Sequence, residues 1–147
     1  MIRKILVATD ASAVSNRAVT FAARLAVQHE ADLLILHVIR DMQLPETLRD
    51  LPDFEAFDNA RDELMRQAAD RILKEAKRLA RKEGVKNLQT AIGSGDPATS
   101  VAGFARRRKI DLIVVGTRGL SKMKASWMGS VSRKLLDLSE VNCLVVR

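Results

Sequence analysis

The sequence predicts an α/β fold in which one five-stranded parallel sheet carries helices on both faces. Five short apolar runs alternate with longer segments whose apolar residues recur at helical spacing. One of these runs, Leu33–Val38, is almost continuously apolar, which is typical of a strand buried on both faces. Because parallel strands require long crossover connections, the alternating order favours a single sheet covered on both sides.

Composition favours one soluble domain. The 147 residues are 47% hydrophobic and 29% charged, so we expect one domain over residues 1–147 with a variable acidic segment at 41–60. No apolar run approaches the ~18 residues that a membrane span requires. No signal-peptide pattern follows the first residues. We therefore expect a cytoplasmic protein without a membrane partner.

The charge is unevenly distributed. Segment 41–60 has six acids and one base, whereas the rest of the chain has 24 of the 25 bases and 12 of the 18 acids. A basic body of this kind can attract nucleic acid, an anionic membrane surface or a phosphate ligand. The chain has no Tyr, one Trp and four Phe, so it lacks an aromatic platform for stacking single strands. Nucleic acid is therefore not expected as a partner.

The first strand is predicted over Ile2–Ala8 and the first helix over Ser15–His29. Thr9, Asp10 and Ser12 lie between them, at the edge where open parallel sheets bind ligands. A carboxylate there can accept a hydrogen bond from a ribose hydroxyl or hold a magnesium ion that touches phosphate. The alternative is that Asp10 or Ser12 only caps the helix.

The second strand is Leu33–Val38, and a helix is predicted from Asp53 to Glu83. Between them, Arg40–Pro52 is irregular, with two prolines and the first part of the acidic segment 41–60. An apolar stripe along the helix predicts that it packs on the sheet, with its charged side in solvent. The stripe consists of Phe54, Phe57, Leu64, Ala68, Ile72, Ala76 and Leu79. We interpret His37 as a hydrogen-bonded core histidine rather than a catalyst.

The third strand is predicted over Leu88–Ile92, and Asp96 with Pro97 predicts the start of the next helix. That helix ends in four bases, Arg106–Lys109, which suit the negative end of its dipole. The same bases are the strongest candidate for an anion-binding patch in this part of the chain.

The last three elements are a strand at Leu112–Val115, a helix at Val131–Leu138 and a strand at Leu144–Val146. Cys143 is the only cysteine, so the chain can form no internal disulfide. We interpret it as a small buried hydrophobe, with a reactive thiol as the alternative.

A glycine-bearing loop connects the fourth strand to the last helix. Gly116, Gly119 and Gly129 occur with the spacing G-x2-G-x9-G, and Ser130 follows. Backbone N–H groups of such a loop and of a helix N-terminus can converge on phosphate. Glycine is suited to this role because it permits positive φ and close approach of the ligand. Alternatively, these glycines only shape a long connection.

This pattern resembles the nucleotide-binding signature of the universal stress protein (UspA-like) family, in its ATP-binding subgroup. The resemblance covers the whole chain. It includes Met1–Ser12, Leu33–Val38, Gly95–Ala98, Asp111–Gly119 and Cys143–Arg147. Two departures are the absence of a glycine near Glu30 and of a proline just before Cys143.

The resemblance implies the strand order 3-2-1-4-5, an adenine-nucleotide alpha-hydrolase-like Rossmann-type sandwich. Asp10 and Gly116 would then face each other at the switch point. ATP or ADP, with magnesium held through Asp10, is the expected ligand, and the backbone of Val38 is expected to meet the adenine. The predicted nucleotide site consists of Ala8, Thr9, Asp10, Val38, Val115, Gly116, Arg118, Gly119, Gly129, Ser130, Val131 and Ser132.

The resemblance also implies a homodimer formed through the C-terminal strand, Cys143–Val146. We expect a dimeric, nucleotide-dependent switch in stress response. Alternatives are a dimeric scaffold of the same fold that binds no nucleotide, and a weak ATPase. No Ser-His-Asp, paired-carboxylate or histidine–metal arrangement can be traced in the sequence, so we assign no catalytic residue.

Overall fold

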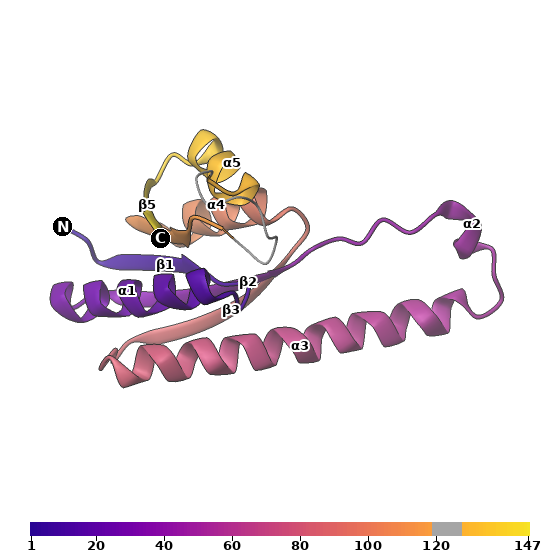
Figure 1. Cartoon of the computed structure of the whole chain (residues 1–147), viewed down its shortest axis with the longest axis horizontal. Coiled ribbons are helices and arrows are strands. Elements are labelled where there is room, and N and C mark those ends of the chain that lie inside the picture. Colours follow the sequence, from indigo (N-terminus) through magenta and orange to yellow (C-terminus); the bar gives the residue numbers. More distant parts are fainter. Residues whose placement is uncertain (119–127) are drawn as a thin grey trace.

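The computed structural model describes residues 1–118 and 128–147 (Figure 1). Its parallel strands lie in the order β3-β2-β1-β4-β5, which confirms the predicted fold class and strand order. The strands are β1 (Lys4–Ala8), β2 (Asp32–Ile39), β3 (Leu88–Ser94), β4 (Leu112–Gly116) and β5 (Asn142–Val146). The helices are α1 (Ala13–His29), α2 (Glu46–Arg49), α3 (Phe54–Lys82), α4 (Pro97–Arg108) and α5 (Ser130–Leu138).

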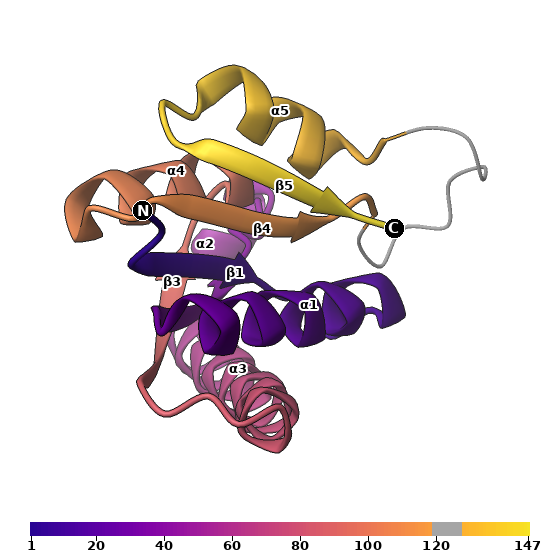
Figure 2. The ribbon, with the colours of Figure 1, turned by 90° about the vertical axis from the view of Figure 1, so that its left-hand side faces the viewer.

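Both faces of the sheet are covered, as the apolar strands require. Figure 2 shows α1 and α3 on one side of the strands and α4 and α5 on the other. Successive strand residues point to opposite faces. Ile35 lies in the cluster with α1 and α3, whereas its neighbour Leu36 lies in the cluster with α4 and α5. Both side chains are fully buried.

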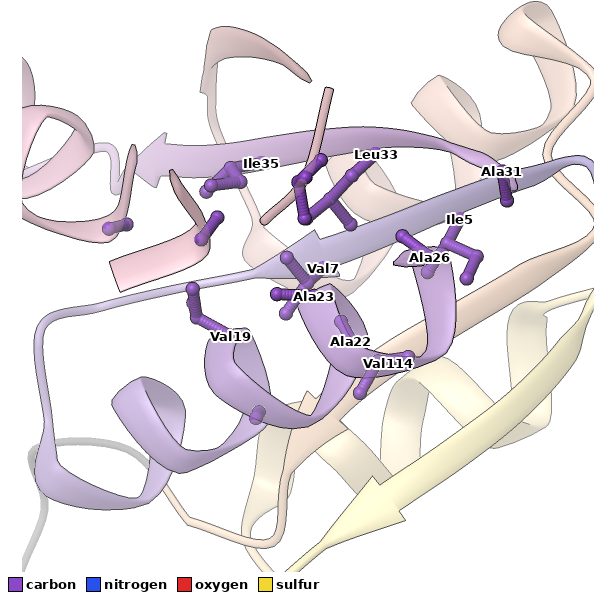
Figure 3. Close-up of a cluster of buried hydrophobic side chains, with 14 of the residues drawn as sticks. Ile5, Val7, Val19, Ala22, Ala23, Ala26, Ala31, Leu33, Ile35 and Val114 are labelled. Carbon is purple, nitrogen blue, oxygen red and sulfur yellow. The ribbon is translucent and has the colours of Figure 1, made fainter. Parts of the chain in front are cut away.

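The helical side of the first cluster is built mainly from alanine. Figure 3 shows Ala22, Ala23 and Ala26 of α1 beside the strand residues Ile5 and Val7. On α3 the buried alanines are Ala69, Ala76 and Ala80. Because these side chains are short, the helices lie close to the sheet while the strands supply most of the apolar volume.

The prediction that α3 packs on the sheet along its whole length is wrong for its N-terminal half. The first buried residue of α3 is Ala69, and Phe57 and Leu64 are exposed. Figure 1 shows this half extending with α2 beyond the sheet. The helix has 29 residues and is about 44 Å long, whereas the eight-residue strand β2 spans only about 26 Å. The excess length has no strand beneath it.

Helix α1 ends in the left-handed conformation without a glycine. Glu30, at its C-cap, has φ 53° and ψ 35°. Its N–H donates to the carbonyls of Ala26 and Val27, as in a glycine-terminated helix. Helix α1 therefore ends with the geometry typical of a glycine cap although no glycine is present, and the backbone of Glu30 is strained as a result.

Burial disfavours the reactive form of Cys143. The side chain is half-buried in β5, and this burial raises the pKa of its thiol. Since the thiolate is the reactive form, the structure favours the interpretation of Cys143 as a small hydrophobe. The turn before β5 is closed by Ser139 instead of a proline, because the Val141 N–H donates to Ser139 Oγ at 3.0 Å.

The predicted N-cap Asp96 is confirmed, and it also connects α4 to α5. One carboxylate oxygen accepts the Thr99 N–H at 3.0 Å and the Thr99 hydroxyl at 2.8 Å. The same oxygen lies 3.1 Å from Lys134 Nζ of α5. These bonds, with those from Thr99 the strongest, lower the pKa of the Asp96 carboxyl from 3.8 to about 2.

Replacing Asp96 with alanine is expected to lower the free energy of unfolding at pH 7 by about 1 kcal/mol, the usual cost of a lost N-cap. The folded-state pKa is depressed, so the stabilisation is full above pH 4 and disappears as the pH falls toward 2. Urea unfolding of both proteins between pH 2 and 7 measures this difference. A difference that did not shrink in acid would contradict the assigned cause.

Candidate nucleotide site

The ends of β1 and β4 are neighbours, as the strand order requires. The two strands pair in parallel, with Leu6 opposite Ile113 and Val7 opposite Val114. The chain leaves β1 for α1 on one face of the sheet, whereas the helix after β4, α5, lies on the other face (Figure 2). This divergence defines a topological switch point, where open α/β sheets bind ligands.

Asp10 and Ser12 have separate roles in the turn after β1. Ser12 caps α1, because its Oγ accepts the Ser15 N–H at 3.1 Å. Asp10 Oδ1 accepts the Ser12 N–H at 2.9 Å and holds a turn in which Ala11 has φ 66°. Among the residues that the structure describes, Asp10 Oδ2 accepts no hydrogen bond. One carboxylate oxygen of this half-buried side chain is therefore available to a ligand or cation.

The side chain of Thr9 is used inside the protein. It is buried, and its Oγ1 lies 3.1 Å from Ser15 Oγ. The Thr9 carbonyl accepts a hydrogen bond from Nδ1 of His37 at 2.8 Å, so Nδ1 carries the proton. His37 thus fixes the end of β1 from the neighbouring strand, in agreement with its interpretation as a hydrogen-bonded core histidine. The sequence alone did not indicate the structural role of Ser15, because a serine at the start of a helix can form several different hydrogen bonds.

Glycine is required at positions 116 and 129 because a side chain would not fit there, and not because the backbone has positive φ. Among the described glycines, only Gly84 and Gly95 have positive φ. A Cβ on Gly116 would lie 2.7 Å from Val14 Cγ1, at the start of α1. A Cβ on Gly129 would lie 2.9 Å from the carbonyl oxygen of Thr117. The positive φ expected from the sequence is therefore wrong for these two positions, whereas the expected close approach of a ligand stays a prediction.

The start of α5 is held against the segment that follows β4. The Gly129 N–H donates to the Thr117 carbonyl, and the Thr117 N–H donates to the Val146 carbonyl at 2.8 Å. Ser132 is buried, with its hydroxyl within bonding distance of the carbonyls of Thr117 (3.2 Å) and Gly129 (3.0 Å). Gly129 N–H and Ser132 Oγ are thus engaged with the protein, whereas Ser130 is exposed at the first position of the helix.

The remaining predicted residues are spread around this edge. Ala8 ends β1, and Val115 is the penultimate residue of β4. Val38 is half-buried near the end of β2, opposite Gly93 of β3. Arg118 is half-buried and makes an interaction of its own. Gly119 lies outside the described residues, so its predicted contact stays a prediction.

The composition of this edge fits a phosphate ligand better than a protein-bound metal cluster. The first amides of a helix have no acceptor within the helix, so those of Ser130 and Val131 can donate to an anion. Over residues 1–118 and 128–147, no group of three or more His, Cys, Asp or Glu side chains gathers as metal ligands. A single carboxylate such as Asp10 suits magnesium that is held mainly by nucleotide phosphates.

A surface hollow of about 430 Å³ lies at the opposite edge of the sheet. It is lined by the amino ends of β1 and β2, together with Lys86 and Arg108. Ligands of open parallel sheets bind beyond the carboxyl ends of the strands. We therefore place the candidate site at the switch point and not in this hollow.

Comparison with known proteins identifies the family. The chain matches the universal stress protein family over residues 1–147, and it belongs to that family. It is 36% identical to the universal stress protein YxiE of Bacillus subtilis, with both sequences covered completely. No helix in the described part of the chain is long and apolar enough to cross a membrane.

Solved structures agree with this assignment. Universal stress protein UspA from Lactobacillus plantarum is 27% identical and superposes with a TM-score of 0.83, over 99% of this chain and 98% of that one. A universal stress protein solved in complex with cAMP is 26% identical, with a TM-score of 0.71. The two chains are covered to 99% and 97%.

Proposed function

We propose that this protein binds ATP or ADP at the switch point, with magnesium, and acts as a nucleotide-dependent switch. The observation that carries the proposal is the packing of Gly129 against Thr117. It places the exposed N-terminus of α5 directly beside the segment that leaves β4. A helix N-terminus beside the carboxyl ends of two parallel strands is a favourable place for phosphate groups.

In this proposal, each of these residues contacts a different part of the nucleotide. The amides of Ser130 and Val131 and the Ser130 hydroxyl bind phosphate oxygens, and Asp10 Oδ2 receives magnesium or a ribose hydroxyl. Val38 contributes backbone contacts to the adenine. Gly129 N–H can join the phosphate contacts only if it gives up the Thr117 carbonyl.

A relative supports the ligand class. The 26% identical protein that was solved with cAMP shows that an adenine nucleotide binds to a protein of this family and fold. The preference for ATP or ADP rests on this chain's glycine loop and on Asp10. The intact G-x2-G-x9-G pattern argues against a scaffold that binds no nucleotide, so we rank that alternative second.

We further propose that β5 joins two copies of the chain. It is the edge strand of the sheet, and Cys143 to Val146 are only half-buried. An apolar edge strand with open backbone groups favours pairing with a second copy about a two-fold axis. The protein is then a dimeric switch, and any hydrolysis of ATP by it is slow.

Replacing Asp10 with asparagine is expected to weaken magnesium–ATP binding about tenfold, close to 1.4 kcal/mol. The amide keeps the oxygen that accepts the Ser12 N–H but loses the charge that attracts magnesium. Without magnesium, the affinity for ATP should change less than threefold. Isothermal titration calorimetry with and without magnesium measures both constants.

The matched control is Asp50→Asn, which removes the same charge from an exposed position at the end of α2, the helix that lies beyond the sheet in Figure 1. It should bind like the wild type in both conditions. If millimolar ATP with magnesium gives the wild type neither heat nor a rise in Tm, the proposed function is wrong. Measuring ADP release by wild type and Asp10→Asn separates slow hydrolysis from binding alone.

A further inference from the structure

Residues 40–68, which we call the arm, leave an apolar surface open to solvent. The arm consists of the segment after β2, α2 and the N-terminal half of α3, and it projects from the body in Figure 1. On the α3 part, Phe57, Leu64 and Met65 are 53, 65 and 36% exposed. Phe57 and Leu64 are seven residues apart and therefore lie on one side of the helix.

The N-terminal half of α3 lacks tertiary packing. None of its 15 residues before Ala69 is buried, whereas packing of an apolar face supplies most of the stability of helices in proteins. Burying an exposed Phe, Leu or Met side chain contributes about 1.5–3 kcal/mol. The arm therefore needs a surface that covers it, and burial of its apolar side chains would stabilise that contact.

The charges of α3 indicate what covers it. Residues 53–63 contain five acids and one base, whereas residues 64–82 contain seven bases and two acids. Two copies of α3 side by side in antiparallel orientation place each acidic half against a basic half. A parallel pair places like charges together and is disfavoured.

We propose that the arm is a self-association surface, on which α3 of one copy packs antiparallel against α3 of a second copy. The contact is isologous, since the same apolar side chains are used on both copies. It is independent of the proposed β5 contact, because α3 packs beside β2 while β5 is the opposite edge of the sheet. The inference does not depend on nucleotide binding.

Sedimentation equilibrium of the full chain tests the proposal with a matched pair of variants. Leu64→Glu places a charge on the apolar surface and is expected to weaken the arm contact at least tenfold. Asn59→Glu adds the same charge to an exposed position on the other side of the same helix and should assemble like the wild type.

The masses distinguish the two contacts. If both exist, the wild type is a tetramer or larger and Leu64→Glu is a dimer. With the arm contact alone, a dimer becomes a monomer. Equal masses for wild type and Leu64→Glu, whether both are dimers or both monomers, overturn the arm inference. A wild-type dimer that Leu64→Glu leaves intact still allows pairing through β5. A loss of stability without a change in mass shows the arm folding onto its own body instead.

Charge reversal tests the orientation. Arg71→Glu with Lys74→Glu is expected to weaken the contact at least tenfold, and Arg106→Glu with Arg108→Glu, the same change on exposed residues of α4, should not. Adding Asp53→Lys, which lies four residues before Phe57 on the apolar side of α3, to the first pair in one chain should regain at least threefold of the lost affinity. Restoration requires antiparallel pairing, because a parallel pair would face Lys with Lys and Glu with Glu. Failure to restore overturns the orientation.

Discussion

Replacing Leu135 with alanine should lower the free energy of unfolding by about 2–5 kcal/mol. Leu135 is fully buried in the cluster that α4 and α5 form with the sheet. Alanine there leaves a cavity as well as losing apolar burial. Because Leu135 anchors the short helix α5, whose first residues carry the proposed phosphate contacts, nucleotide affinity should fall as well. Urea unfolding and calorimetry measure the two effects.

The neighbouring Leu136 provides the control for this substitution. It is 42% exposed on the same helix, so Leu136→Ala makes the same chemical change with little loss of burial. We expect its cost to stay below about 1 kcal/mol, in the range of surface substitutions. If the two variants were equally destabilised, α5 would not be anchored as the structure shows.

Replacing Gly129 with alanine should weaken nucleotide binding by about 5- to 150-fold, the equivalent of 1–3 kcal/mol of overpacking. The new Cβ would lie 2.9 Å from the Thr117 carbonyl oxygen and 3.3 Å from Arg118 Cα. Both neighbours are backbone atoms, so either the start of α5 or the segment after β4 must move. A titration with ATP and magnesium measures the change in affinity.

Gly103→Ala is the matched glycine control for that experiment. Gly103 lies inside α4, and its nearest neighbour, at 3.1 Å, is the guanidinium of the flexible Arg107. Alanine there should stabilise the helix by about 0.5–1 kcal/mol and leave nucleotide affinity unchanged. Normal binding by Gly129→Ala would show that the close contact at Thr117 is not required.

Local pattern was sufficient to predict the class and order of the elements. Parallel strands buried on both faces are almost continuously apolar, and Leu33–Val38 shows this clearly. Boundaries were less accurate because long-range contacts determine them. The first strand begins at Lys4 and not at Ile2. At its start, the amides of Arg3 and Lys4 donate to Asp111 Oδ2 at 2.8 and 2.9 Å.

The adjacency of the strand ends that precede Asp10 and carry Gly116 was predictable, but the contacts around these residues were not. The sequence placed Asp10 and Gly116 at adjacent strand ends once the strand order was given. It could not show that Val14 lies against Gly116 or that Thr117 holds Gly129 and Ser132, because these contacts join residues far apart in the chain. Likewise, the apolar stripe of α3 shows which side is apolar, but not where the sheet beneath it ends.

The alanine lining of α1 and α3 determines which substitutions the interior can tolerate. An alanine side chain is a single methyl group. Shortening it to glycine removes little volume, so no large cavity can form at these positions. Enlargement is the damaging change there. At Ala22 or Ala23, each fully buried, even a valine would push the helix away from the strands. We therefore expect these alanine positions to tolerate only small residues, whereas the strand positions should tolerate the exchange of one branched side chain for another.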